Sequence, residues 1–382
     1  GSRLRVNPAA FNEAYMMYAS TSPQYSMIAS LDTATEMMKK DGFRLSHRMI
    51  CGAIELRKEL ARRARRAREA LENRETGKNG ESRQGTERKQ EDFRRNGNNW
   101  AFGIWQPEWV EVDGQRILFE EADTQYLASH QEPWVLSPEE GWHGFEEIEQ
   151  DYVMLDPIKL TVTTPGLAED GSMQEFGVPA PIVARFLTEY DIVCEKADYY
   201  SFLMLNSLGT DRVKQEAFLE ALDEFRLHFE ENTPLRDILP GLARAFPKVW
   251  GQIGLAEHCR KMHSFFRENE ILKAMNQACS RLPEPAMTPS EAYREIVGGR
   301  VEQIELREAA ERICASMIAP YPPGIPLIMG GEILRGDSAV YRYLELLERF
   351  ENEFPGYGNE IHGVEKAEQN GKIVFLILCL ER

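Results

Sequence analysis

The spacing of apolar and polar residues divides the chain into a helical beginning, a central region of strands and helices, and a mostly helical region that ends in a strand. The first apolar stretch, Phe11–Pro23, is typical of a helix until it breaks into four small residues and a proline. A second helix is predicted from about Leu45, because Ile50, Ile54 and Leu60 give that segment an apolar side.

The central region is predicted to form a small layered unit. Asp113-Gly114, inside the stretch Val110–Glu120, is a strong hairpin signal. The β-branched run Lys159–Thr164 predicts a strand. Alternating strands and helices of this kind are typical of a small α/β domain. The other elements expected here are a helix over Pro179–Tyr190, strands over Ile192–Glu195 and Phe202–Leu208, and an amphipathic helix over Asp211–Glu230.

The last region begins after Asn232-Thr233-Pro234, which breaks the pattern and is a plausible domain boundary. Beyond it the chain is predicted to be mostly helical. Pro320–Pro326 is expected to be a rigid extended loop, because its prolines restrict the backbone around Tyr321. The further elements predicted are helices over Ser290–Val297, Glu305–Ala319 and Val340–Phe350, and a strand over Lys372–Leu380.

The second helix is predicted to continue into Ala61–Ala70, and a polar segment follows it. Five arginines fall within Ala61–Arg68, and Asn73–Asn99 is nearly all polar, with four glycines. A segment this polar buries too little apolar surface to fold. We therefore expect a flexible, solvated insertion. The arginines also allow a nucleic-acid reading, but the Asp and Glu interleaved after them favour a solvated arm.

Composition narrows the class of protein. A chain of 382 residues suggests about two or three domains. The net charge of −17 argues against nucleic acid and anionic membranes as partners, and no apolar run reaches the roughly 18 residues of a membrane span. The cysteines form no CxxC pair, which predicts reduced thiols in a cytoplasmic protein. His258 and His263 are five residues apart, a spacing that does not favour a metal site on one helix face.

The small residues that end the first apolar stretch have two interpretations. Ser20, Thr21 and Ser22 offer several O–H donors beside backbone N–H groups released by the break, which suits a phosphate. The structural interpretation is the end of a helix followed by a cap, where Ser, Thr and Pro are common for local reasons.

Seven motifs occur in order along the chain. They read FNEAYMMYASTSPQYSMIASLD, WHGF, LDPIKLTVTTPG, GVPAPIVARFL, IVCEK, PYPPGIPLIMGGE and FPGYGNEIHG. Together they resemble the C-terminal half of the acid-inducible (biodegradative) lysine, ornithine and arginine decarboxylases, most of all the lysine and ornithine members. The resemblance covers essentially the whole chain except the polar insertion. It implies a pyridoxal-phosphate enzyme with the aspartate-aminotransferase fold.

The resemblance also implies the domains. Residues 1–39 would be the last strip of the large cofactor domain, and residues 40–232 its small α/β domain with the insertion at about 62–98. Residues 233–382 would be a C-terminal α+β domain. The family's Schiff-base lysine follows a histidine, and this sequence contains no His-Lys pair. The catalytic lysine and the main cofactor contacts are therefore expected upstream, in a part that this chain lacks.

The resemblance implies roles for individual residues. Ser20, Thr21 and Ser22 would contact the pyridoxal phosphate of a neighbouring subunit, so the enzyme would be a dimer or an assembly of dimers. Glu195 of IVCEK would bind the distal ammonium of lysine or ornithine, and Tyr321 would lie near the substrate entrance. The structural alternatives are a surface ion pair for Glu195 and a packed loop residue for Tyr321.

Four further motif residues have no role that the sequence defines: Trp142, His143, Asp156 and Lys159. For His143 a hydrogen-bonded structural role is favoured over catalysis. Lys159 is the lysine most easily mistaken for the Schiff-base residue, although its position in the motif does not match that of the cofactor lysine.

Three functions remain open from the sequence. The chain would be the C-terminal part of a basic-amino-acid decarboxylase that forms a diamine and CO2 and works with an N-terminal half or a full-length subunit. It could instead be an inactive half-enzyme that acts as an interaction module, or an unrelated α/β protein. In the first two cases we expect the chain alone to be inactive, because it lacks the Schiff-base lysine.

Overall fold

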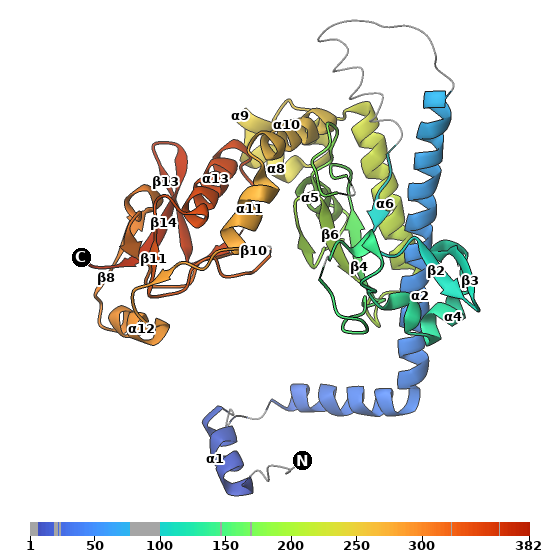
Figure 1. Ribbon diagram of the computed structural model, residues 1–382, viewed down its shortest axis with the longest axis horizontal. Helices are drawn as coiled ribbons and strands as arrows, with labels where there is room; N and C mark the ends of the chain where they lie inside the picture. The colour runs from blue at the N-terminus through green and yellow to red at the C-terminus, as the bar shows by residue number, and fades with distance from the viewer. Residues whose placement is uncertain are drawn as a thin grey trace, which may run out of the picture.

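The computed structural model describes residues 7–18, 22, 24–76, 100–145, 147–168, 170–321, 323–358 and 360–382. An N-terminal arm leads into a central α/β unit, and a C-terminal unit lies on the far side of a helical layer (Figure 1). This order follows the chain and agrees with the mixed α/β and α+β fold class that the sequence predicted. None of the described helices combines the length and apolar character that a membrane crossing requires.

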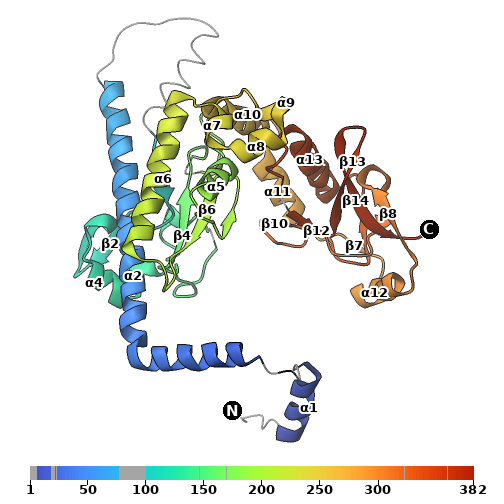
Figure 2. The same cartoon turned by 180° about the vertical axis from the view of Figure 1, so that it is seen from behind.

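Two helices form the arm. α1 spans Pro8–Tyr18 and buries none of its residues, and α2 spans Tyr25–Thr76. α2 turns sharply partway along its length, so that its first part runs away from the central unit and its second part runs along it (Figures 1 and 2). The predicted first helix and second helix are thus both present, and the second begins about 20 residues earlier than the sequence indicated.

The start of the predicted polar insertion is helical. α2 continues through its arginine-rich segment to Thr76, which confirms the predicted continuation of the helix into Ala61–Ala70 and extends it by six residues. The reason is that two of the arginines have acidic partners on other elements: Arg63 contacts Asp223 at 2.8 Å, and Arg65 contacts Glu120 at 2.8 Å. The rest of the predicted insertion, residues 77–99, lies outside the described residues.

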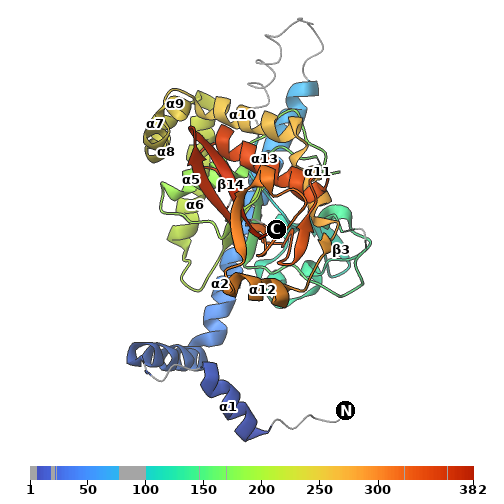
Figure 3. The same ribbon diagram turned by 90° about the vertical axis from the view of Figure 1, so that its left-hand side faces the viewer.

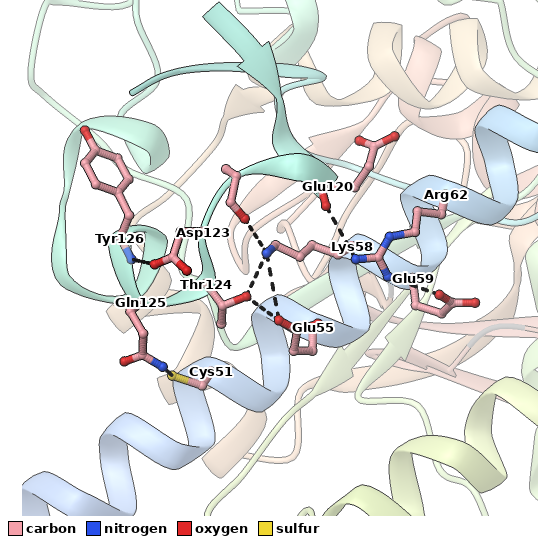
Figure 4. Close-up of polar contacts among 11 residues, drawn as sticks. Cys51, Glu55, Lys58, Glu59, Arg62, Glu120, Asp123, Thr124, Gln125 and Tyr126 are labelled. Atoms are coloured by element: carbon pink, nitrogen blue, oxygen red, sulfur yellow. Dashed lines mark hydrogen bonds and ion pairs between the residues drawn. The ribbon is translucent and has the colours of Figure 1, made fainter. Parts of the chain in front are cut away.

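The second part of α2 is fixed by polar side chains as well as by apolar ones. The Lys58 ammonium is buried and donates to Ala122 O (2.5 Å) and Thr124 Oγ1 (2.7 Å), and Thr124 in turn donates to Glu55 (Figure 4). The Asp123 carboxylate accepts from Tyr126 N–H (2.9 Å) and caps the short helix that follows. These contacts attach α2 to the segment 119–129.

The central unit contains a four-stranded antiparallel sheet in the order β1-β4-β6-β5. The strands are β1 (Gly103–Ile104), β4 (Lys159–Thr163), β5 (Lys196–Ala197) and β6 (Ser201–Leu205), and the helices are α4 (Thr124–Ser129), α5 (Ala180–Thr188) and α6 (Arg212–Glu231). α5 and α6 pack together, and the predicted Lys159–Thr164, Pro179–Tyr190 and Asp211–Glu230 elements are confirmed within a residue or two at each end.

The predicted hairpin is also present. β2 (Trp109–Val112) pairs with β3 (Gln115–Leu118) around Asp113 and Gly114, whose φ angles are 52° and 76°. Positive φ at both central residues defines the type I′ turn, which is the reason that Asp-Gly is so strong a hairpin signal. Two 3₁₀ turns follow, at Phe119–Glu121 and Glu132–Trp134, and a third lies at Gly141–His143.

The predicted strand Ile192–Glu195 is wrong. Ile192 N–H donates to Leu187 O (3.1 Å), and Asp191 has a φ of 57°, so these residues close the end of α5. A helix end with a left-handed residue uses the backbone groups that a strand would need. The strand β5 begins only at Lys196.

A helical layer follows the central unit, as predicted. Its helices are α7 (Leu235–Ile238), α8 (Pro240–Ala245), α9 (Pro247–Trp250), α10 (Leu255–Glu268) and α11 (Ile271–Cys279). α10 contacts α6 of the central unit and α11, and α11 packs on α13 of the C-terminal unit, so the layer joins the two.

The C-terminal unit is built on small antiparallel sheets. β14 (Lys372–Leu380) lies between β13 (Val364–Gln369) and β8 (Val301–Glu305), and α13 (Ala339–Glu353) packs against it (Figure 3). The remaining elements are β7 (Glu284–Pro285), α12 (Pro289–Val297), a 3₁₀ turn at Leu306–Glu308, β9 (Arg312–Ile313), β10 (Ala319–Tyr321), β11 (Glu332–Leu334) and β12 (Glu360–His362).

The predicted helix Glu305–Ala319 is wrong. The segment instead contains the end of β8, a 3₁₀ turn, β9 and the start of β10. Its residues are good helix formers, but Ile304 and Glu305 pair with Ile377 and Leu376 on the long apolar strand β14. Helix propensity is worth only tenths of a kcal/mol per residue, so pairing with a buried strand outweighs it.

Candidate functional site

Glu195 lies just before the edge strand β5. Its backbone N–H donates to Leu203 O (2.9 Å), which fixes its position against the neighbouring strand β6. The Glu195 side chain is exposed, and no ion pair joins it to Lys196 or to another described residue. The structure therefore shows a fixed backbone with an open carboxylate, and it gives no support to the alternative of a surface ion pair.

The turn that follows Glu195 is anchored to the rest of the molecule by two buried tyrosines. The hydroxyl of Tyr199 contacts the hydroxyl of Tyr343 on α13 at 2.8 Å, and Tyr200 Oη lies 2.7 Å from His263 Nδ1 on α10. Burial raises the pKa of both tyrosines, so their hydroxyls stay protonated. The position of Glu195 thus depends on the helical layer and on the C-terminal unit, and not on its own sheet alone.

The contacts of His263 define its tautomer. Nε2 lies 3.0 Å from Gln174 O, which can only accept, so Nε2 carries the proton. Nδ1 is then the acceptor for the Tyr200 hydroxyl. Burial lowers the pKa of His263, which keeps the ring neutral and preserves this arrangement. His263 is therefore a structural residue that supports the Glu195 turn.

Tyr321 is at the end of β10, where it pairs with Glu360 on β12. Its side chain is 60% exposed, so the alternative of a packed loop tyrosine is not what the chain shows. Its ring lies over Gly324: a Cβ on that residue would be 2.4 Å from Tyr321 Cε2, and its φ is 78°. Only glycine satisfies both conditions, so Gly324 sets the direction of the ring.

The structure fixes Glu195 and Tyr321 separately. No hydrogen bond or ring contact joins the two among the described residues. β10 lies on the side of the C-terminal unit that faces β6 in both Figures 1 and 2. Glu195 therefore belongs to the central unit and Tyr321 to the C-terminal unit. That both contact the substrate stays a prediction.

Of the three predicted phosphate contacts, Ser20 and Thr21 lie outside the described residues. Ser22 is exposed and lies just before α2, where Met27 and Ile28 N–H both turn back to Gln24 O (3.0 and 3.1 Å). The first turn of α2 contains no acidic residue. A hydroxyl beside the start of a long helix without carboxylates has the donor chemistry that a phosphate group requires.

His143 has a structural role. It is buried, its Nε2 lies 2.8 Å from Ser137 O, and its Nδ1 accepts from Phe145 N–H (3.1 Å). Both ring nitrogens are used within one loop, as the structural interpretation of this residue requires.

Trp142 and the segment Thr163–Pro165 line a common hollow of about 1150 Å³, so two of the seven sequence motifs meet in space.

The LDPIKL motif is held in place by a residue that the sequence did not single out. Arg57 on α2 is fully buried and donates to the carbonyl oxygens of Pro157 (2.9 Å), Asp156 (3.2 Å) and Lys159 (2.6 Å). Its guanidinium also reaches Trp105 O and lies over the ring of Trp134. Burial lowers its pKa to about 9, an arginine value that only a dry site produces. In the sequence it stands between Leu56 and Lys58, so nothing there distinguishes it from the surface arginines of the same helix.

Lys159 is exposed on β4, and its backbone carbonyl accepts from Arg57. Among the described residues, no three His, Cys, Asp or Glu side chains are grouped as a metal ion would require. The candidate residues therefore offer a carboxylate and a phenol on fixed backbone positions, and a hydroxyl just before α2. Such a set can bind and orient a charged substrate, and it needs another group to supply bond cleavage.

The fold is that of the C-terminal portion of an amino-acid decarboxylase. Residues 1–214 match the major domain of the Orn/Lys/Arg decarboxylases, and residues 272–381 match the C-terminal domain of the same enzymes. The chain belongs to the Orn/Lys/Arg decarboxylase family, whose members are pyridoxal-phosphate lyases.

Curated relatives and solved structures agree with this assignment. The chain is 40% identical to the lysine decarboxylase LdcA of Pseudomonas aeruginosa over 383 residues, which is 100% of this chain and 46% of the relative. It is 34% identical over 381 residues to the biodegradative arginine decarboxylase of Escherichia coli, with 98% of this chain and 46% of the relative covered. The chain thus spans less than half the length of these relatives.

The similarity extends to three dimensions. The solved lysine decarboxylase A from Pseudomonas aeruginosa superimposes with a TM-score of 0.81 at 37% identity, and covers 100% of this chain and 46% of its own. The constitutive lysine decarboxylase of Escherichia coli superimposes with a TM-score of 0.79 at 34% identity, and covers 99% of this chain and 46% of its own. The resemblance inferred from the seven motifs is confirmed.

Proposed function

We propose that this chain is the C-terminal part of a pyridoxal-phosphate-dependent decarboxylase that converts lysine or ornithine to a diamine and CO2. The observation that carries the proposal is the fixed, exposed carboxylate of Glu195 in a chain of this family. Both substrates end in a compact ammonium that one carboxylate neutralises. Arginine's guanidinium is longer, planar and forked, so the same carboxylate would place it badly.

The partner we propose is the remaining part of the decarboxylase, as a separate polypeptide or within a full-length subunit, in a dimer or an assembly of dimers. The arm supports this proposal, because the described residues of the chain leave its large apolar side chains exposed. An apolar surface of this kind marks a protein interface. The exposed residues are Phe11, Tyr15, Met16, Met17, Tyr18, Tyr25, Met27, Ile28, Leu31, Met37, Met38 and Phe43.

In the assembled enzyme, the residues of this chain would bind and orient. Pyridoxal phosphate, when bound, would supply the electron sink that decarboxylation requires. Ser22, with Ser20 and Thr21, would donate hydrogen bonds to the phosphate of the neighbouring subunit's cofactor. Glu195 would hold the distal ammonium of the substrate, and Tyr321 would narrow its entrance. We place this enzyme in the cytoplasm, where the six cysteines, all free in the structure, stay reduced.

The test of the substrate role is Glu195→Gln in the assembled enzyme, because glutamine keeps the shape and removes the charge. Truncating one partner of a buried charge pair costs about 2–5 kcal/mol. We therefore expect a fall of at least about 30-fold in kcat/KM for lysine and ornithine, and a smaller fall for a substrate without the distal charge.

Glu189→Gln is the matched control, because Glu189 is an exposed carboxylate at the end of α5 in the same unit. It should leave kcat/KM unchanged. If Glu195→Gln also keeps lysine and ornithine turnover within about twofold, which is well under 1 kcal/mol, Glu195 does not read the substrate and the specificity proposal is wrong.

The uncovered arm also favours a second candidate function, in which the chain is an inactive interaction module that binds a full-length relative. The two functions predict the same partner but a different activity. A complex of this chain with the remaining part of the enzyme that binds pyridoxal phosphate but releases no CO2 from lysine, ornithine or arginine would favour the module.

A further inference from the structure

Two buried cysteines face each other across neighbouring strands of the C-terminal unit. Cys314 follows β9, and it forms an isolated antiparallel bridge with Cys379 near the end of β14. Both side chains are 0% exposed, and both are free thiols. The motifs that define the family do not include either residue, and the proposed decarboxylation does not use them.

The backbone contacts show which kind of pair this is. Ala315 N–H donates to Leu378 O (2.8 Å), one residue beyond the pair on each strand, and Cys314 N–H points to Glu332 O (2.9 Å) on the other side. Cys314 and Cys379 therefore exchange no backbone hydrogen bond. In such a non-hydrogen-bonded pair the Cα atoms are about 4.5 Å apart and the side chains are at their closest. That separation lies at the short end of the roughly 4.4–6.8 Å that a disulfide spans.

We propose that Cys314 and Cys379 are a site of reversible oxidation, at which a low-molecular-weight disulfide closes a bond between β9 and β14. The register places the two sulfur atoms together without any movement of the strands along each other. In a reducing compartment the pair would rest as thiols, as in the structure, and it would close when oxidised small disulfides accumulate.

The surroundings make the two thiols unequal. The neighbouring Cys314 thiol lowers the pKa of Cys379, and the Arg312 guanidinium nearby acts in the same direction. The same thiol–thiol contact, together with burial, raises the pKa of Cys314. Arg312 is held in place by Leu380 O and Glu302. Because Arg312 is bound to the carbonyl of the residue next to Cys379, a thiolate is best stabilised at Cys379, which we assign as the nucleophile, with Cys314 as the resolving thiol.

The chemistry balances in two exchange steps. The Cys379 thiolate attacks one sulfur of the small disulfide, forms a mixed disulfide and releases the first small thiol. Cys314 then loses its proton to the solvent and attacks the Cys379 sulfur, which releases the second small thiol. Two protein thiols have become one disulfide, and one small disulfide has become two thiols.

Access to the buried pair requires only a local opening. The ladder between β13 and β14 ends at the pair Val364–Ile377. Among the described residues, the rest of β14, residues 378–380, is paired on that edge through the Cys314 bridge. A single bridge opens more readily than a continuous ladder, and the neighbouring strand β8 holds β14 in place meanwhile. The new bond would fix the strand that leads through Ile318 to β10 and Tyr321.

The test is peptide mapping of the full chain after incubation with oxidised glutathione and alkylation of the remaining thiols. Trypsin separates the two cysteines, because Ile313–Arg335 and Ile373–Arg382 each contain one cysteine and no internal Lys or Arg. We expect a linked pair of these two peptides, with the mass of both less two hydrogen atoms. Dithiothreitol should separate the pair, and the Tm of the chain should be higher before this reduction than after it.

Two serine variants and one native cysteine complete the test. Cys314→Ser should stop the reaction at the glutathione adduct of Cys379, whereas Cys379→Ser should leave Cys314 as a thiol. Cys259, equally buried but without a cysteine partner among the described residues, should remain a thiol throughout. If Cys314 and Cys379 in the parent chain stay alkylatable after prolonged oxidation, or if they pair with other cysteines, the proposal is wrong.

Discussion

The two parts of helix α2 have the same backbone structure and opposite surroundings. Along the first part, residues 25–40, every side chain is exposed, including Ile28 at 52% and Leu31 at 67%. Along the second part, Ile54 and Leu60 are 0% and 1% exposed and pack into two different hydrophobic clusters. Both parts contain apolar residues, so the difference lies in what covers them.

This contrast shows where the described chain is complete in itself and where it is not. The second part of α2 has its partners within the chain: the sheet of the central unit, the segment 119–129 and α6. The first part has apolar residues for which the described chain supplies no partner. Helices in proteins gain most of their stability from packing an apolar face against another element. The first part of α2 should therefore depend on another polypeptide for its stability.

The largest effect is expected from the residue that holds the second part of α2 to the LDPIKL motif. Arg57→Met should destabilise the chain by about 3–5 kcal/mol, because it leaves several buried carbonyl oxygens without a donor. Arg48→Met, at an exposed position on the same helix, is the control and should change stability by less than about 0.5 kcal/mol. Urea unfolding followed by tryptophan fluorescence measures both. Equal effects of the two variants would show that Arg57 does not hold the motif.

Two leucines on the one helix test the contrast directly. Leu60→Ala should cost about 2–5 kcal/mol, the range for a buried leucine, whereas Leu31→Ala in the chain alone should change stability by less than about 0.5 kcal/mol. Leu31→Ala should instead weaken binding to the rest of the enzyme. A large loss of stability from Leu31→Ala in the isolated chain would mean that the arm is covered in solution, which would contradict the comparison.

Lowering the pH should destabilise the chain by a smaller amount, through a histidine that is buried in the helical layer. His258 on α10 is packed among aromatic rings: its ring centroid lies 4.5 Å from that of Trp250 and 5.0 Å from that of Tyr357. Burial lowers the pKa of His258 to about 3. An unfolded histidine titrates near 6.5, so between these values the unfolded state binds more protons. The stability that the neutral ring provides is complete above about pH 6.5 and is lost as the pH falls toward 3.

His258→Phe should therefore flatten the acid side of the stability profile. Between pH 6.5 and 5 the free energy of unfolding should fall by about 2 kcal/mol less in His258→Phe than in the parent. His362→Phe, at an exposed position on β12, should keep the parent's pH dependence. If the His258→Phe and parent profiles are parallel, His258 does not titrate as its burial requires.

The sequence predicted those elements whose signals are local. Asp113-Gly114 identified its hairpin because positive φ at two successive residues is a property of the turn itself. Glu305–Ala319 was predicted wrongly because its residues favour a helix by themselves, and only the remote strand β14 provides the pairing that overrides them. Ile192–Glu195 failed for a related reason, since the end of α5 uses the backbone groups of Ile192.

For the candidate site, the sequence supplied the residues but not their support. The motifs located Glu195 and Tyr321, and the structure shows both exposed on fixed backbone segments. The anchors were missed, because Tyr200 and His263 are 63 residues apart in the chain and neither resembles a site residue. Arg57 was missed because a buried arginine is recognisable only when its acceptors, 99 to 102 residues away, are known.

The central claim is that this chain holds and orients the substrate but depends on the rest of the enzyme for catalysis. The most direct measurement is CO2 release from lysine with pyridoxal phosphate, by the purified chain alone and by the chain co-expressed with the part of Pseudomonas aeruginosa LdcA that it does not cover. Alone, the chain should release CO2 no faster than free pyridoxal phosphate; together, the two polypeptides should co-purify and decarboxylate lysine. Turnover by the chain alone above the free-cofactor rate would contradict the account, as would a co-purified pair that leaves lysine intact.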